Sequence, residues 1–130
     1  MRFMYIVTSE RPAVPTPALM EAMGKLADRE IKAGRMIDSG GLMPLSTGAQ
    51  VRIREGELSV VDGPFVEAKE MIGGYAIFEL RDKEEALASA IEFMQLHKRH
   101  MPGWEGTCEL RAFASPQHDL GCQVDVSAHA

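Results

Sequence analysis

The sequence has few of the features that hold secreted and membrane proteins together. It contains two cysteines and one tryptophan in 130 residues, and two cysteines do not make a disulfide-rich secreted scaffold. No apolar run approaches the ~20 residues that a membrane span needs. The N-terminal segment MRFMYIVTSE has too short an apolar stretch for a signal peptide. We therefore expect a cytoplasmic protein that has no membrane partner.

Positive charge is also scarce. The chain has 14 basic and 19 acidic side chains, which gives a net charge of −5. Phosphate binding needs a basic surface, so this balance disfavours nucleic acid as the main partner, and we expect none. Apolar residues make up 45% of the chain, enough to fill one core. We expect one domain over residues 1–114, followed by a tail at 115–130 that is disordered or docked on a partner subunit.

Hydrophobic periodicity predicts a mixed α+β fold. Thr16 is expected to cap the first helix and Gly34 to end it, and Asp82 with Glu85 forms a capping box before the second. The core stripe of the second helix is predicted to be Ala86, Leu87, Ala90, Ile91 and Met94. Strands are expected at 2–8, 36–45, 75–80 and 107–113, helices at 17–33 and 83–98, and a hairpin at 51–54 and 58–61.

Without the hairpin, this order is the β-α-β-β-α-β pattern of ferredoxin-like domains. Both helices would cover one face of the sheet. The other face would carry Met4, Ile6 and Ala76, Phe78 or their alternates, and it must also be covered. A second copy of the chain can cover it, so we predict a homodimer with a cleft between the two sheets.

The most informative stretch is LSVVDGPFVEAKEMIGGY, residues 58–75. Asp62-Gly-Pro-Phe forms a rigid bend, because Asp bonds nearby backbone, Gly accepts positive φ and Pro fixes φ. An acidic and basic cluster and a pair of glycines follow it. We expect this edge to bind a ligand through Asp62, Lys69, Gly73, Gly74 and Tyr75.

Each of these residues also has a plain structural interpretation. Asp62 can bond the backbone of its own turn, and Glu67 with Lys69 can form an exposed ion pair instead of a base beside a cation. Gly73-Gly74 can mark a bulge or a crossing strand. The ring of Tyr75 can pack while its hydroxyl finds a backbone acceptor.

Glu30 is the least expected charge, because it falls inside the apolar arc of the first helix. A buried, unpaired carboxylate costs several kcal/mol, so Glu30 should have a partner. Glu30 and Glu67 are the candidate catalytic residues. The alternative to catalysis, which we favour for Glu30, is a structural ion pair with an Arg or Lys.

The remaining polar groups give no catalytic or metal site. His97 and His100 lie with two basic residues in the segment HKRH at a helix end, where we expect a basic cap. No third ligand follows at zinc-site spacing, so we predict neither a metal nor a cofactor. Cys108 occupies an apolar position in the alternating pattern of the strand predicted at 107–113, and it is expected to be a small core residue.

Asp62-Gly-Pro-Phe, followed by Glu67, Lys69-Glu70 and Gly73-Gly-Tyr75, strongly resembles the DGPF family of YCII-related proteins. The resemblance implies a dimeric α+β barrel of two ferredoxin-like subunits, and some members occur beside genes for extracytoplasmic-function sigma factors. In the wider group a helix His and an Asp are proposed as a catalytic pair. Alignment on Gly34-Arg35 places Met23 and Lys32 at those two positions, so enzyme status does not carry over to this chain.

Three functions remain open at this point. The first is a homodimeric small-molecule-binding or accessory protein linked to a sigma factor or its regulator. The second is an enzyme that uses carboxylate acid–base chemistry on a small organic substrate in the dimer cleft. The third is a purely structural interaction module.

Overall fold

The computed structural model describes residues 1–11, 13–62 and 71–114. Every predicted strand and helix is present, with ends that differ by a few residues. The second strand ends four residues earlier than predicted, at Gly41. In chain order the elements are β1 (Arg2–Ser9), α1 (Pro17–Lys32), β2 (Met36–Gly41), the short 3₁₀ helix η1 (Leu45–Thr47), β3 (Gln50–Arg54), β4 (Glu57–Val61), β5 (Met71–Glu79), α2 (Lys83–His100) and β6 (Gly106–Ala112).

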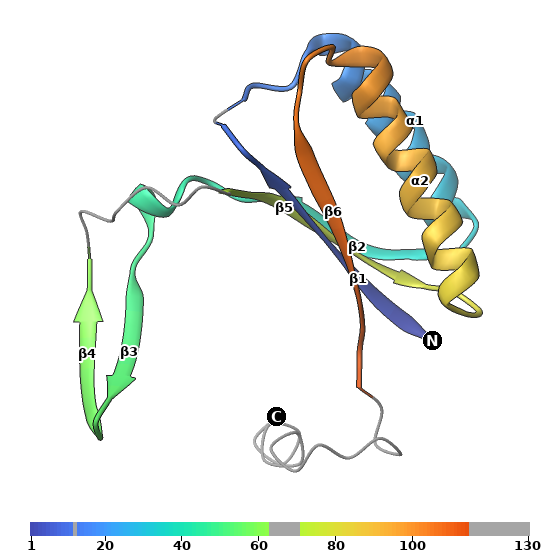
Figure 1. Cartoon of the computed structure of the whole chain (residues 1–130). Coiled ribbons are helices and arrows are strands. Elements are labelled where there is room, and N and C mark those ends of the chain that lie inside the picture. Colours follow the sequence, from blue (N-terminus) through green and yellow to red (C-terminus); the bar gives the residue numbers. More distant parts are fainter. Residues whose placement is uncertain (12, 63–70, 115–130) are drawn as a thin grey trace.

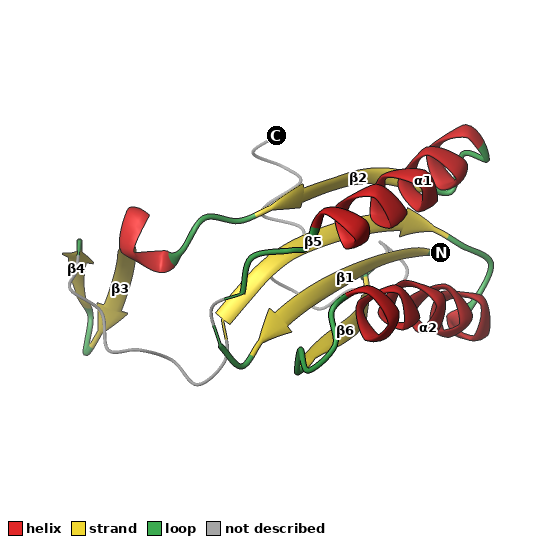
Figure 2. Ribbon diagram, turned by 90° about the horizontal axis from the view of Figure 1, so that it is seen from above, coloured by secondary structure: helices red, strands yellow, loops and turns green. Residues whose placement is uncertain are grey.

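Four of the strands form one antiparallel sheet in the order β2-β5-β1-β6, and β3 pairs with β4 in a separate hairpin. Both helices lie side by side on one face of this sheet (Figures 1 and 2). This order and layering confirm the predicted ferredoxin-like α+β fold with an inserted hairpin. None of the helices in the described residues is both long and apolar enough to cross a membrane.

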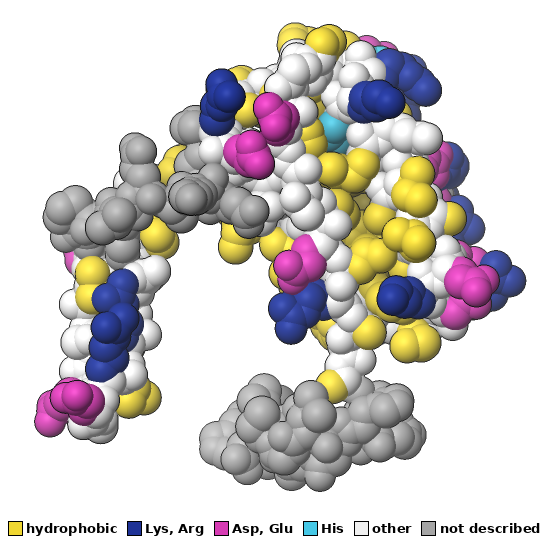
Figure 3. Space-filling model, in the orientation of Figure 1, with side chains coloured by type: hydrophobic (Ala, Val, Ile, Leu, Met, Phe, Trp, Pro, Cys, Tyr) yellow, Lys and Arg dark blue, Asp and Glu magenta, His cyan; other side chains and the backbone are white. Residues whose placement is uncertain are grey.

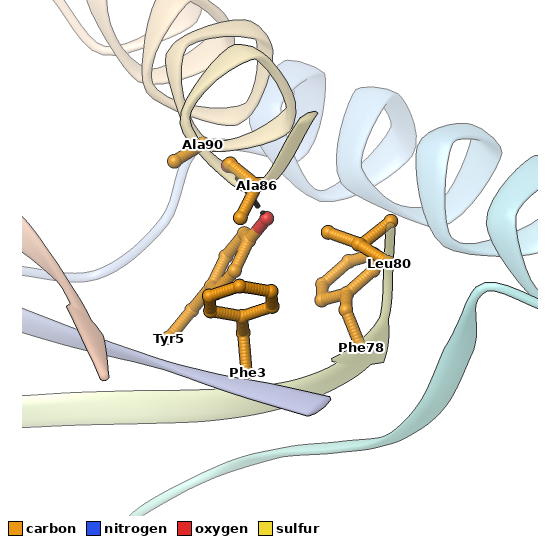
Figure 4. Close-up of a cluster of buried hydrophobic side chains, with 6 residues drawn as sticks. All are labelled: Phe3, Tyr5, Phe78, Leu80, Ala86 and Ala90. Atoms are coloured by element: carbon orange, nitrogen blue, oxygen red, sulfur yellow. Dashed lines mark hydrogen bonds between the residues drawn. The ribbon is translucent and has the colours of Figure 1, made fainter. Parts of the chain in front are cut away.

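The core lies between the sheet and α2 (Figure 4). Phe3 and Tyr5 alternate with outward-facing residues on β1, and the Tyr5 ring stacks on Phe78 with centroids 4.6 Å apart. The Tyr5 hydroxyl donates to the backbone oxygen of Ala86 at 2.8 Å, which ties β1 to α2. Burial raises the pKa of this hydroxyl, so it remains a donor at neutral pH.

The predicted core stripe of α2 is wrong in part. Ala86 and Ala90 are buried, but Leu87 and Ile91 are each 49% exposed. The helix turns its small residues toward the large aromatic rings of the sheet, because a fixed spacing between helix and sheet leaves no room for two bulky layers.

The helix ends follow the sequence closely. Thr16 Oγ1 accepts from the Leu19 amide at 3.1 Å, and the same hydroxyl donates to the backbone oxygen of His100 at 2.8 Å. Gly34 follows α1 with φ of +75°, a conformation that favours glycine.

The capping box before α2 is only half formed. Asp82 accepts from the Glu85 amide at 2.9 Å, as expected of an N-cap. The Glu85 carboxylate reaches one residue further back than expected, to the amide and side chain of Arg81.

The β3–β4 hairpin turns at Glu55-Gly56, which have φ of 51° and 80°. Positive φ at both central residues is the geometry of a type I′ turn. The hairpin lies beyond the end of the main sheet and apart from the helices (Figure 1).

Candidate functional site

The sheet face opposite the helices is the candidate site. The register pairs Met4 with Ile77 and Ile6 with Tyr75 on this face, while Phe3 and Phe78 point to the helices. Ala76 and Phe78 therefore face the core, and their alternates Tyr75 and Ile77 lie on the open face. Met4, Ile6 and Ile77 are only half-buried in a single chain. An apolar patch thus occupies the centre of a sheet face that has no helix on it.

Charged groups flank this apolar patch on both sides. On β6, Glu109 lies opposite Ile6 and forms an ion pair with Arg111 at 3.3 Å. On the other side, β2 places Asp38 opposite Ile77. The open face therefore combines an apolar centre with charged groups at its edges, as small-molecule sites commonly do.

Tyr75 and Asp38 form the most specific contact on this face. The Tyr75 hydroxyl donates to Asp38 Oδ2 at 3.1 Å, and the Ser39 amide donates to Asp38 Oδ1 at 2.8 Å. The carboxylate raises the pKa of Tyr75, because it accepts the phenol proton and would repel a phenolate. The expectation of a backbone acceptor for Tyr75 was wrong, since the acceptor is a side chain that the sequence did not single out.

The glycines beside Tyr75 bring two strands close together. A Cβ on Gly74 would lie 2.8 Å from the backbone oxygen of Gly40, so the approach of β2 explains why residue 74 has no side chain. Gly73 sits where the β1–β5 register shifts, which is the predicted bulge. A ligand contact of either glycine stays a prediction.

The acidic bend falls largely outside the described residues. Asp62 follows β4 and is exposed, while its turn partners and both Glu67 and Lys69 lie in the segment 63–70 that the structure does not describe. That Asp62 and these residues form one site therefore stays a prediction.

Glu30 has the partner that its burial requires. Its side chain is 4% exposed, and Arg35 donates to it from Nε at 3.0 Å and from Nη2 at 2.5 Å. Arg29 Nε donates to the same carboxylate at 3.2 Å and also binds Glu92. Hydrogen bonds from Arg35 lower the pKa of Glu30 against the opposing effect of burial. This geometry is that of the structural ion pair, and it opposes a role for Glu30 as a general acid.

The two positions aligned with the proposed YCII catalytic pair carry no such chemistry here. Met23 is half-buried on α1. Lys32 forms an exposed ion pair with Asp28 at 2.8 Å. Among the described residues, no group of three metal-binding side chains comes together.

The predicted basic cap at the end of α2 is wrong for His97. This side chain is buried, packs between Phe93 and Trp104 with ring centroids 4.7 Å away on each side, and its Nδ1 lies 3.2 Å from the Phe93 oxygen. Burial lowers the pKa of His97, because it disfavours the charged imidazolium. Cys108 is half-buried against the core, as expected, and burial raises its pKa to about 11.

Two hollows on the surface lie away from the open sheet face. One of about 360 Å³ is bordered by Met94, Lys98 and Trp104, and one of about 220 Å³ by Arg29, Glu30 and Glu92. Tyr75 and Asp38 border neither of these hollows. The open face is thus a surface in one chain, and a second layer is needed to make it a cleft.

Comparisons with known proteins give a family. The chain is 30% identical over 81 residues to the uncharacterized protein R00369 of Rhizobium meliloti strain 1021, and the match spans 62% of this chain and 65% of that protein. It also resembles 5-chloro-2-hydroxyhydroquinone dehydrochlorinase from Burkholderia phenoliruptrix AC1100, solved with 2,5-dihydroxybenzoquinone. That likeness has 17% identity and a TM-score of 0.42 over 92% of this chain and 99% of the other, and we conclude nothing from it. The sequence model of the YCII-related domain family matches residues 1–93, and the chain therefore belongs to the YCII-related family.

Proposed function

We propose that this protein is a homodimer that binds a small organic molecule between two stacked open sheet faces. The observation that carries the proposal is the Tyr75–Asp38 hydrogen bond at the edge of an apolar patch. A sheet with helices on one face needs a second layer on the other, and a second copy of the chain supplies it.

The chemistry of the face favours a molecule with an apolar body and one hydrogen-bonding group. Met4, Ile6 and Ile77 offer half-buried apolar contact. The Tyr75 oxygen can accept a further hydrogen bond while its proton is held by Asp38, and Asp38 can accept from a ligand hydroxyl or amine. In an apolar site, a small number of polar groups is enough to fix the orientation of a ligand.

Residues of the acidic bend would complete this site. We place Asp62, Lys69, Gly73 and Gly74 at its edge, with residues 1–114 as the domain and 115–130 as a tail that is disordered or docked on the partner subunit. Membership of the DGPF group and the link to a sigma factor belong to the same proposal. A pulldown with the sigma factor that retains no partner would count against that link.

Catalysis is the second candidate function, and the present geometry favours it less. Glu30 accepts hydrogen bonds from two arginines that lower its pKa, so at neutral pH it is an ionised carboxylate with no proton to donate and with its oxygens already occupied. Glu67 remains the better candidate base. If a retained molecule is turned over, Glu67→Gln should abolish turnover, and unchanged turnover would remove this residue from the mechanism.

Native mass spectrometry of protein purified from its own host tests the proposal directly. We expect a dimer mass plus a bound small molecule. Tyr75→Phe and Asp38→Asn should lower the bound fraction at least fivefold, while the control Asp28→Asn on the helix side should retain it. A dimer whose bound molecule is unaffected by both site variants would contradict the proposed site.

A further inference from the structure

The β3–β4 hairpin carries an apolar side that remains exposed in a single chain. Val51 lies opposite Val60 and Ile53 opposite Leu58, and directly opposed residues share one side of a two-stranded sheet. These four side chains are 66%, 68%, 73% and 68% exposed in that order. Four large aliphatic side chains in two adjacent cross-strand pairs form a continuous patch, in contrast to single apolar residues scattered over a surface.

The other side of the same hairpin is polar except for Val61, which lies opposite Gln50. Arg52 lies opposite Ser59 and Arg54 opposite Glu57. The basic side chains of the hairpin line up along one side of it in Figure 3. Alternation of this kind, which holds over residues 51–54 and 57–60, specifies which side is to be buried. A two-stranded hairpin is marginal in water by itself, so the apolar side needs a second layer.

The path of the chain carries the hairpin away from its own sheet. Gly41, the last residue of β2, pairs with Gly74 of β5, and the Leu42 amide still donates to the Gly73 oxygen at 3.0 Å. The chain thus continues past the end of the sheet in the direction of β2. Figures 1 and 2 both show the hairpin beyond that end and away from α1 and α2.

We propose that the apolar side of the hairpin docks on a second copy of this chain, as an exchanged arm that covers part of the open sheet face. That face offers matching aliphatic side chains at Met4, Ile6 and Ile77. Two-fold symmetry lets each arm cover the other copy, so both apolar surfaces are buried together. This inference rests on the proposed homodimer and adds that the ligand site in one copy is closed by the arm of the other.

A pair of neighbouring substitutions on opposite sides of β4 tests the docking. Val60→Lys places a charge on the apolar side, and Ser59→Lys places the same charge on the polar side as the matched control. By analytical ultracentrifugation, Val60→Lys should raise the dimer dissociation constant at least tenfold and Ser59→Lys by less than twofold. Circular dichroism verifies that both variants fold. A Val60→Lys dimer constant within twofold of the parent would overturn the proposal.

Photo-cross-linking distinguishes an exchanged arm from one that folds back. The photoreactive residue p-benzoylphenylalanine replaces Leu58, and ¹⁵N-labelled and unlabelled chains are mixed before irradiation. Cross-linked peptides that join one labelled and one unlabelled chain support the exchanged arm. Cross-links within single chains only, or none from a dimer, overturn the arm and leave the homodimer standing. A monomer mass at every concentration contradicts the homodimer itself.

Discussion

Tyr75 lies directly across from Gly40 in the β2–β5 pair, and its ring occupies the space that a side chain at residue 40 would need. A Cβ built on Gly40 would lie 3.1 Å from Cε1 of that ring. The ring covers the bare backbone of β2, as aromatic residues do when they face a glycine in a sheet. This packing points the Tyr75 hydroxyl at Asp38, which lies on β2 two residues before Gly40.

The Tyr75–Asp38 contact has a measurable consequence for titration. Asp38→Asn removes the negative charge and the carboxylate acceptor, so the pKa of Tyr75 should fall toward the ordinary value of 10.0. NMR of ¹³C-labelled tyrosine between pH 8 and 12 can follow it, since the chain has only two tyrosines. The other tyrosine, Tyr5, is buried elsewhere and serves as the internal control. An unchanged Tyr75 titration would show that the bond does not form in solution.

The two glycines of the Gly73-Gly74 pair should respond very differently to alanine. At residue 74 a Cβ would meet the Gly40 oxygen at 2.8 Å, whereas at residue 73 the nearest atom is the Val7 oxygen at 3.8 Å. Gly74→Ala should cost about 1–3 kcal/mol of unfolding free energy, because the backbone of β2 must move. Gly73→Ala should change it by less than about 1 kcal/mol.

Urea denaturation of both glycine variants measures this difference. Equal effects of the two substitutions would argue against the close β2–β5 approach. They would return Gly74 to the ligand interpretation, in which bare backbone faces a bound molecule.

Glu30 should contribute to stability more than to chemistry. Glu30→Gln leaves a neutral amide against Arg29 and Arg35, so the free energy of unfolding should fall by about 2 kcal/mol. The pKa of Glu30 is lowered on folding, so its stabilisation is complete above its ordinary value of 4.5 and is lost as the pH falls through its folded value.

A matched control for Glu30 exists on the same helix. Glu21→Gln breaks an ion pair with Lys25 in which both side chains are at least 70% exposed, and its effect should stay below about 0.5 kcal/mol. Denaturation at pH 7 compares the two variants. Equal losses would contradict the structural role assigned to Glu30.

His97 should make stability depend on pH near neutrality. Burial lowers its pKa on folding, so the unfolded chain binds a proton that the folded chain resists. Stability is complete above the ordinary pKa of 6.5 and decreases as the pH falls below it, until the folded value is reached. His97→Leu should lose this slope. Chemical denaturation between pH 5 and 8 gives both curves, and parallel curves would show that His97 titrates normally in the fold.

Local patterns were sufficient to predict the elements of this fold. Thr16, Gly34 and Asp82 mark helix ends through their own backbone chemistry, which depends only on neighbouring residues. The alternation around Glu55-Gly56 predicted the hairpin in the same way. The charge of Glu30 on an apolar arc correctly predicted a buried partnership, because helical period alone places it there.

The contacts that the sequence did not predict depend on how distant segments of the chain pair and pack. Asp38 meets Tyr75 only because β2 pairs with β5 with a shift between Met36 and Asp38, and no local pattern fixes that shift. His97 sits in a basic run, yet the chain turns back after α2 and Trp104 covers its ring. Such contacts depend on where the chain returns, so composition and spacing do not reveal them.

One hydroxyl joins the start of the first helix to the finish of the second. Thr16 satisfies a free amide at one end and a free carbonyl at the other, so neither terminal turn can fray without leaving the other short of a partner. The two helices are separated in sequence by the 50 residues 33–82, and this hydroxyl links them into one cooperative layer. The helix-covered side of the molecule is thus packed within a single chain, while the open sheet face remains available for association.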